Sequence, residues 1–144
     1  MGDSVDIVND VHSRLNATRV AEVAQPRDVD ELRAAIQRAA HRGWCVSVCG
    51  GRHAMGGQQF GDSTLLIDTT ALTRTLRFDG ANGHIEMEGG AQWPQVIRAT
   101  HAAQPGDVRW SIRQKQTGAD CLTLGGAVAA NVHGRDRDHA RRRG

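Results

Sequence analysis

The sequence has almost no lysine, no long apolar run and no leader-like start. Lys115 is the only lysine among eighteen basic residues, and the net charge of +2 is dispersed over arginines. So weak and scattered a charge argues against a nucleic-acid partner. No stretch reaches the roughly 18 apolar residues of a membrane helix, and the acidic start MGDSVDIVND lacks the basic and then apolar order of a signal peptide. We therefore expect a cytoplasmic chain that binds neither nucleic acid nor a membrane.

Cysteine is scarce as well. The three cysteines, Cys45, Cys49 and Cys121, are odd in number and lie in core-like segments, unlike a secreted disulfide framework. Cys45, Cys49 and His53 follow one another at steps of four, but no second pair completes a tetrahedral zinc site. We expect reduced cysteines buried as packing, and no metal site.

The first half of the chain has the pattern of a strand, a helix and further strands. With 144 residues, of which 39% are hydrophobic, the chain suits one compact core. An apolar stretch at 20–25 stops at Pro26, and a helix follows in which Asp28 and Glu31 form a capping box. Compact apolar strands at 45–48 and 64–68 flank a glycine-rich loop. This order predicts a βαβ unit, in which a right-handed crossover lays the helix over a small parallel sheet.

The second half changes character. Turn residues at 79–83 between apolar segments predict a hairpin, and a helix over 92–103 is expected to carry Pro94 in its first turn. Residues 118–134 predict a loop followed by a helix rich in glycine and alanine. The surface of this helix has almost no side chains, so a bulky group can approach it closely. We expect Trp93 and Trp110 to be packing residues, and the charged end at 135–144 to be a disordered tail.

The glycine loop at 50–61 is the first candidate for chemistry. Glycine tolerates positive φ and has no Cβ, so successive backbone amides can turn inward on an anion such as a diphosphate. Gly51 and Gly56 have Walker-A spacing, but Gly57 and Gln58 stand where that motif needs Lys and Ser or Thr, and no GxGxxG is present. The loop indicates either a diphosphate site outside those two classes or a glycine-rich hairpin that binds nothing.

Taken in order, the motifs GGRHAMGG, LLID, WPQVI and TLGGAVAANVHG resemble the FAD-linked oxidases of the vanillyl-alcohol oxidase and p-cresol methylhydroxylase family. The resemblance covers about residues 20–134. In that family a GxGHS loop wraps the FAD diphosphate, and a second loop, TVGG followed by HG, lies against the other side of the cofactor. The resemblance implies that main-chain amides of both glycine turns converge on one FAD.

The fold class that follows is α+β, a truncated p-cresol-methylhydroxylase-type FAD-binding fold. A small βαβ parallel-sheet subdomain is followed by the start of a second, mainly antiparallel β subdomain with helices. The expected divisions are an N-terminal extension at 1–19, a partial FAD-binding domain at 20–134 and the basic tail at 135–144.

The resemblance also assigns cofactor-binding residues. They are Gly51, Arg52, His53, Ala54, Gly56 and Gln58 in the first loop, and Gly118, Ala119, Thr123, Gly125, Gly126, Asn131 and His133 in the second. His53 stands where many relatives carry a histidine bonded covalently to the flavin; otherwise it hydrogen-bonds a phosphate or caps the loop. Arg52 and Ala54 depart from the family pattern, and Arg52 either contacts phosphate or has no such role. His133 is expected to fix the second loop beside the flavin.

The implied function is that of the N-terminal, FAD-binding part of an oxidoreductase. In intact relatives a small-molecule alcohol, sugar or hydroxy compound gives a hydride to FAD, and oxygen or another acceptor reoxidises it. Those relatives continue beyond the HG motif into a substrate domain, so we expect a truncated or frame-shifted end here and identify no catalytic residue. The alternatives are a non-catalytic nucleotide-binding fragment that needs a partner chain and a soluble α/β domain without a ligand. The sequence leaves substrate, electron acceptor and oligomeric state open.

Overall fold

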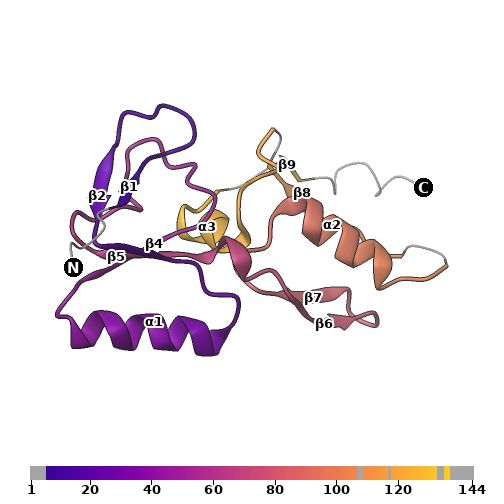
Figure 1. Cartoon of the computed structure of the whole chain (residues 1–144). Coiled ribbons are helices and arrows are strands. Elements are labelled where there is room, and N and C mark those ends of the chain that lie inside the picture. The colour runs from indigo at the N-terminus through magenta and orange to yellow at the C-terminus, as the bar shows by residue number, and fades with distance from the viewer. Residues whose placement is uncertain (1–5, 107–108, 117, 133–134, 137–144) are drawn as a thin grey trace. The chain divides into compact units, whose positions relative to one another are not determined.

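The chain divides into two compact units, Met1–Leu72 and Thr73–Gly144. The computed structural model describes residues 6–106, 109–116, 118–132 and 135–136 (Figure 1). The first unit contains a parallel sheet and the second an antiparallel hairpin with helices, which confirms the predicted α+β class. Over the described residues, the helices are all too short or too polar to cross a membrane.

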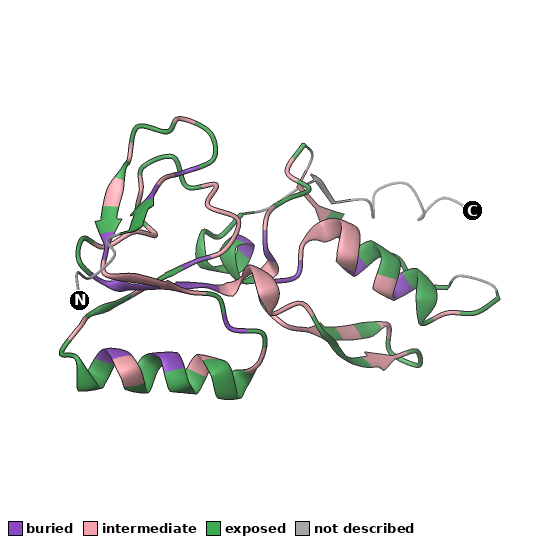
Figure 2. Cartoon of the chain, viewed as in Figure 1, coloured by how far each residue is buried: buried purple, intermediate pink, exposed green. Residues whose placement is uncertain are grey.

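The first unit is built on a central buried strand. Its parallel sheet has the order β3-β5-β4, formed by β3 (Glu22–Ala24), β5 (Leu65–Asp68) and β4 (Val46–Cys49). Side chains alternate between the two faces of a strand. Leu65 and Ile67 accordingly pack on Ala35 and Ala39 of the helix α1, while Leu66 packs in a separate cluster on the other face. Figure 2 shows β5 as a buried strand between two covering layers.

The helix α1 (Val29–His41) forms as predicted, with one change at its start. The Asp28 carboxylate accepts a hydrogen bond from the Glu31 amide at 2.8 Å, as in a capping box. The Glu31 carboxylate, however, accepts from the amide of Arg27 at 2.9 Å. The cap therefore closes one residue earlier than the sequence pattern predicts.

An antiparallel hairpin covers the second face of the sheet. It consists of β1 (Asp6–Val8) and β2 (Thr18–Val20), and buries Val8 and Val20 against Leu66 and Cys49. The apolar stretch at 20–25 contains β3, as predicted, but its first residue, Val20, ends β2. Ala21 separates β2 from β3, because its amide bonds to the Thr64 carbonyl at 2.8 Å and turns the chain from one sheet into the other.

The cysteines are all free thiols. Cys49 is buried as expected, but Cys45 and Cys121 are exposed, so the packing interpretation is wrong for those two. Cys45 precedes the edge strand β4, which has a neighbour on one side. Within the described part of the chain, no three His, Cys, Asp or Glu side chains lie close enough to hold a metal ion.

The second unit opens with the predicted hairpin and helix. The hairpin pairs β6 (Thr75–Asp79) with β7 (His84–Met87), and α2 (Trp93–Ala102) follows with Pro94 in its first turn. Trp110 covers the hairpin turn and donates its indole N–H to the Gly80 carbonyl at 2.8 Å. Trp93 donates to Oε1 of Gln116 at 2.9 Å. Both indoles are thus held within the second unit by hydrogen bonds, and Trp110 is 37% exposed.

The end of the described chain is more ordered than expected. The short helix α3 (Leu124–Ala129) follows its loop as predicted, and β8 (Gln114–Lys115) pairs with β9 (Arg135–Asp136). The prediction of a disordered tail is therefore wrong for residues 135–136, because they find a strand partner. Residues 137–144 lie outside the described residues.

Candidate functional site

The glycine loop (residues 50–61) begins where β4 ends, at the carboxyl edge of the parallel sheet. Within the described residues, the backbone amides of Gly51, Arg52, His53 and Ala54 have no protein acceptor. Residues 51–53 are half-buried and Ala54 is exposed, so these donors are open to a ligand. A run of unpaired amides in a turn is the arrangement that binds phosphate oxygens. We call residues 51–54 the amide turn.

The centre of the amide turn is held from two sides. Arg52 adopts the left-handed conformation, with φ of +56°, which is uncommon for a long side chain and is found where surrounding contacts enforce it. Its guanidinium Nη2 lies 2.8 Å from Oδ2 of Asp68, at the end of β5. Its carbonyl accepts from the Val11 amide at 3.1 Å. Arg52 therefore ties the loop to the sheet, while its predicted contact with phosphate stays a prediction.

The thiol of Cys49 lies beneath this ion pair. Burial raises the pKa of Cys49, and the negative charge of Asp68 raises it further against the opposing effect of Arg52. A thiol with a raised pKa stays protonated at neutral pH and is a poor nucleophile. Cys49 is therefore a packing residue under the loop rather than a reactive group.

A segment that sequence reasoning passed over also contacts the loop. Residues 9–16, which we call the N-terminal clasp, connect β1 to β2. Asn16 donates to the Met55 carbonyl at 2.6 Å, and Nε2 of His12 lies 2.8 Å from Nδ1 of His53. The only signal in the sequence is the density of turn-forming residues in NDVHSRLN, which indicates a loop but not its neighbour.

The clasp is organised around the carboxylate of Asp10, which is only 2% exposed. This carboxylate accepts from the Ser13 hydroxyl at 2.8 Å, from the Asn16 amide group at 2.9 Å and from the His12 backbone amide at 3.0 Å. Burial by itself raises the pKa of Asp10, but the bonds from Asn16 and Ser13 outweigh it and hold the pKa well below the usual range. A charged Asp10 thus shapes the clasp at neutral pH.

The remaining predicted residues of the first loop lie on its outer part. Ala54, Gly56 and Gln58 are exposed. The neighbouring Gln59, which was not predicted, donates from Nε2 to the Ala54 carbonyl at 3.2 Å. Its Oε1 is buried and has no partner among the described residues. Gln59 therefore ties the outer part of the loop back to the amide turn through its Nε2.

The second glycine turn is different, because its amides are already used. Leu124 donates to the Ala91 carbonyl at 2.8 Å, and Gly125 donates to the Gly89 carbonyl at 2.7 Å. Gly126 donates to the hydroxyl of Thr123, a buried side chain that caps α3. The prediction that the amides of this turn face the cofactor is wrong for these three residues. They dock α3 onto the segment before α2.

What the second turn offers instead is a surface of small residues. Gly125, Gly126, Ala129 and Ala130 are exposed, and so is Asn131, which has a φ of +48°. A flat group can approach such a surface closely. Ala119 is half-buried in the preceding loop, and the predicted residue His133 lies outside the described residues.

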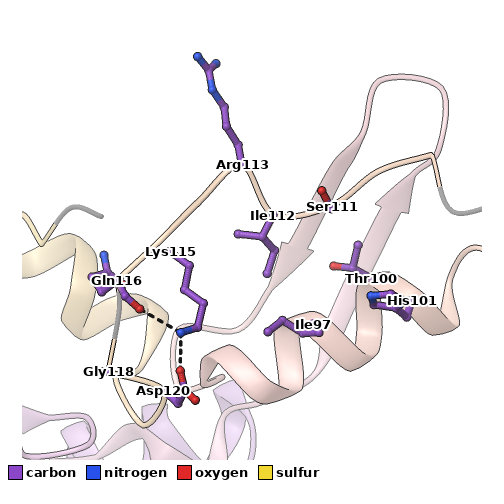
Figure 3. Close-up of a pocket in the computed structure, with 10 residues that line it drawn as sticks. All are labelled: Ile97, Thr100, His101, Ser111, Ile112, Arg113, Lys115, Gln116, Gly118 and Asp120. Carbon is purple, nitrogen blue, oxygen red and sulfur yellow. Dashed lines mark hydrogen bonds and ion pairs between the residues drawn. The ribbon is translucent and has the colours of Figure 1, made fainter. Parts of the chain in front are cut away.

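A cavity of about 690 Å³ lies beside α2 in the second unit (Figure 3). Gly118, one of the predicted residues, contributes to its wall together with Ile97, His101, Lys115 and Asp120. The Lys115 ammonium bonds to the Gln116 carbonyl at 2.9 Å and to the carboxylate of Asp120. The ammonium is thus partly neutralised within the wall.

Comparison with known protein families identifies the family to which the chain belongs. The family model described as the FAD binding domain matches residues 20–141. The chain belongs to the FAD binding domain family. This membership confirms the resemblance drawn from the two glycine motifs and gives the chain FAD as its ligand. Among curated protein sequences, none matches this chain significantly.

Several solved structures share the fold. An alkyldihydroxyacetonephosphate synthase superposes with a TM-score of 0.67 at 19% identity, over 86% of this chain and 25% of that one. Aclacinomycin oxidoreductase superposes with a TM-score of 0.62 at 18% identity, over 86% of this chain and 26% of that one. The present chain therefore spans about a quarter of the length of these two proteins.

Proposed function

We propose that the amide turn binds the diphosphate of FAD. The observation that supports this most is the run of four unpaired backbone amides at Gly51, Arg52, His53 and Ala54. A diphosphate offers several acceptor oxygens and negative charge, which such donors bind without any side chain. The replacement of the family's serine by Ala54 does not weaken the argument, since the donors are backbone groups.

The second loop makes a different contribution in this proposal. The exposed glycines and alanines of α3 provide a face for a flat part of the cofactor, while Thr123 supports that face from inside. Asn131, Gly118 and Ala119 are the polar and loop contacts that we assign beside it, while the predicted residue His133 lies outside the described residues.

His53 is the residue that we propose for covalent attachment of the flavin. Joining an imidazole nitrogen to the flavin methyl carbon replaces one N–H and one C–H bond by an N–C bond. Two electrons and two protons therefore leave, and dioxygen as acceptor would take them to form hydrogen peroxide. His53 is half-buried within the amide turn, which puts its ring at the proposed diphosphate site.

The whole-protein activity that fits this domain is oxidation of a small alcohol, sugar or hydroxy compound by FAD. Bound FAD supplies the hydride-accepting ring, and the chain holds it in a fixed position. Three free thiols suit the reducing cytoplasm. The second candidate is a nucleotide-binding fragment that works with a partner chain, favoured by the one-sided edge strand β4 with exposed Val46 and Val48.

Competition binding tests the diphosphate proposal. The full chain is incubated with FAD and ultrafiltered, with ADP or adenosine added as competitor. We expect FAD to stay with the protein, ADP to displace it, and adenosine, which has the same base but no phosphate, to compete poorly. A folded chain that leaves FAD in the filtrate, or adenosine that competes as well as ADP, would refute it.

Denaturation tests the covalent proposal separately. Yellow colour should remain with the unfolded wild-type chain and disappear in His53→Ala. The matched control is His84→Ala, which removes an exposed histidine of β7. Flavin released completely from the wild type on denaturation would show non-covalent binding.

A further inference from the structure

A contact between two histidine rings joins the clasp to the amide turn. Nε2 of His12 and Nδ1 of His53 are 2.8 Å apart. The rings are tilted by 53° with centroids 4.9 Å apart, so they do not stack face to face. This geometry is that of a shared proton between the two nitrogens, with one ring donating and the other accepting.

We propose that His12 is a positioning residue for His53, and that it reserves Nε2 of His53 for the cofactor. The inference rests on the proposed FAD function. Each imidazole has two nitrogens, and the bond to His12 occupies Nδ1 of His53. Among the described residues, Nε2 of His53 has no partner, so it is the nitrogen left to meet a ligand at the amide turn.

The clasp is rigid enough to act in this way. His12 is flanked by Val11, whose amide bonds to the Arg52 carbonyl at 3.1 Å, and its own amide bonds to Asp10 at 3.0 Å. Asn16 fixes the far end of the clasp on the Met55 carbonyl at 2.6 Å. These contacts fix the backbone on both sides of His12 against residues 52–55 of the loop, which brings the His12 ring within reach of His53.

The arrangement follows a general rule for functional histidines. The nitrogen that reacts or ligates is set by the hydrogen bond at the other nitrogen, which fixes both tautomer and ring orientation. His12 takes the part that a carboxylate or carbonyl plays in other proteins. The bond from His12 occupies Nδ1 of His53 and so holds the orientation of that ring.

The ring resonances of His53 test the proposal without any enzyme activity. Long-range ¹H–¹⁵N correlation spectra of the full chain report each ring nitrogen separately, with and without FAD. In the free protein His12→Ala should move the Nδ1 signal of His53, and His12→Gln, whose amide nitrogen reaches a similar point, should move it less. His84→Ala is the matched control and should leave it unchanged.

FAD should then shift Nε2 of His53 and leave Nδ1 near its free-protein position. Loss of the positioning bond should weaken FAD binding by roughly two- to tenfold in His12→Ala, with partial rescue in His12→Gln. Circular dichroism shows whether each variant folds. If His12→Ala does not fold, the His53 signals and the FAD affinity of His12→Gln provide the test. Unchanged His53 signals in both folded variants, or a shift at Nδ1 on adding FAD, would overturn the proposal. A wild type that shows the His12–His53 coupling but binds no FAD would overturn the proposed function and, with it, the cofactor role of Nε2.

Discussion

The guanidinium of Arg52 forms an ion pair with the carboxylate of Asp68, at 2.8 Å between Nη2 and Oδ2. The pair joins the centre of the amide turn to the last residue of the buried strand β5. Asp68 also accepts from the Thr70 amide at 3.0 Å and so fixes the turn after β5. The carboxyl ends of two parallel strands are thereby locked together where an open α/β sheet binds its ligand.

Arg52→Ala should destabilise the first unit by about 1–3 kcal/mol, because it leaves the partly buried carboxylate of Asp68 without its charged partner. Alanine keeps the same strained backbone, so the change isolates the side chain. Urea unfolding measures the effect. Arg33→Ala is the control, because Arg33 and Asp30 pair on the exposed face of α1, and we expect a loss below about 1 kcal/mol there. Equal losses in the two variants would show that the Arg52 pair has no special role.

Gly125→Ala should also destabilise, although alanine is ordinarily favoured over glycine in a helix by about 1 kcal/mol. A Cβ at this position would lie 3.2 Å from the Gly89 carbonyl oxygen, which already accepts from the Gly125 amide. We expect a net loss of about 1–3 kcal/mol in urea unfolding. The sign of the change in unfolding free energy tests this contact, because a Gly125→Ala variant more stable than the wild type would mean that α3 is not docked on Gly89.

The matched control for Gly125 lies on the same helix. Val128 is 81% exposed, so Val128→Ala removes little packing. Its unfolding free energy should stay within about 0.5 kcal/mol of the wild type. A large loss at Val128 would instead indicate that the exposed face of α3 is covered.

Acid should weaken the fold through Asp10. Its pKa is lower in the folded chain than the ordinary aspartate value of about 4, so the unfolded chain takes up the proton first as pH falls. The stabilisation that charged Asp10 gives the fold is complete at pH values above the ordinary aspartate pKa and is lost progressively at pH values below it. Unfolding free energies at a series of pH values should therefore fall below about pH 4, with a smaller fall in Asp10→Asn. Parallel curves for the variant and the wild type would contradict the account.

Much of the fold could be predicted from local pattern. The cap at Asp28, the apolar run of β5, the turn residues of the β6–β7 hairpin and Pro94 in α2 each act within a few residues of the element they define. The family resemblance located both glycine loops, and the unpaired amides at 51–54 agree with the interpretation of the first loop.

The contacts that define the site more closely could not be predicted, because they join distant parts of the chain. His12 and His53 are 41 residues apart in the sequence. Residues 9–16 have no periodic pattern from which their contact with the glycine loop could be predicted. The amides of α3 have acceptors at Gly89 and Ala91, more than thirty residues earlier. Glycine at 125 predicted room for a ligand, whereas part of that room is taken by the Gly89 carbonyl.

The most direct test of the account is a titration of the ¹⁵N-labelled full chain with FAD, followed by amide resonances. If the diphosphate sits in the amide turn, the N–H signals of Gly51, Arg52, His53 and Ala54 should show the largest saturable shifts, and ADP should reproduce them. The amides of Leu124, Gly125 and Gly126, which keep their protein acceptors, should shift less. Saturable FAD binding that leaves the four signals of residues 51–54 unchanged would contradict the central claim.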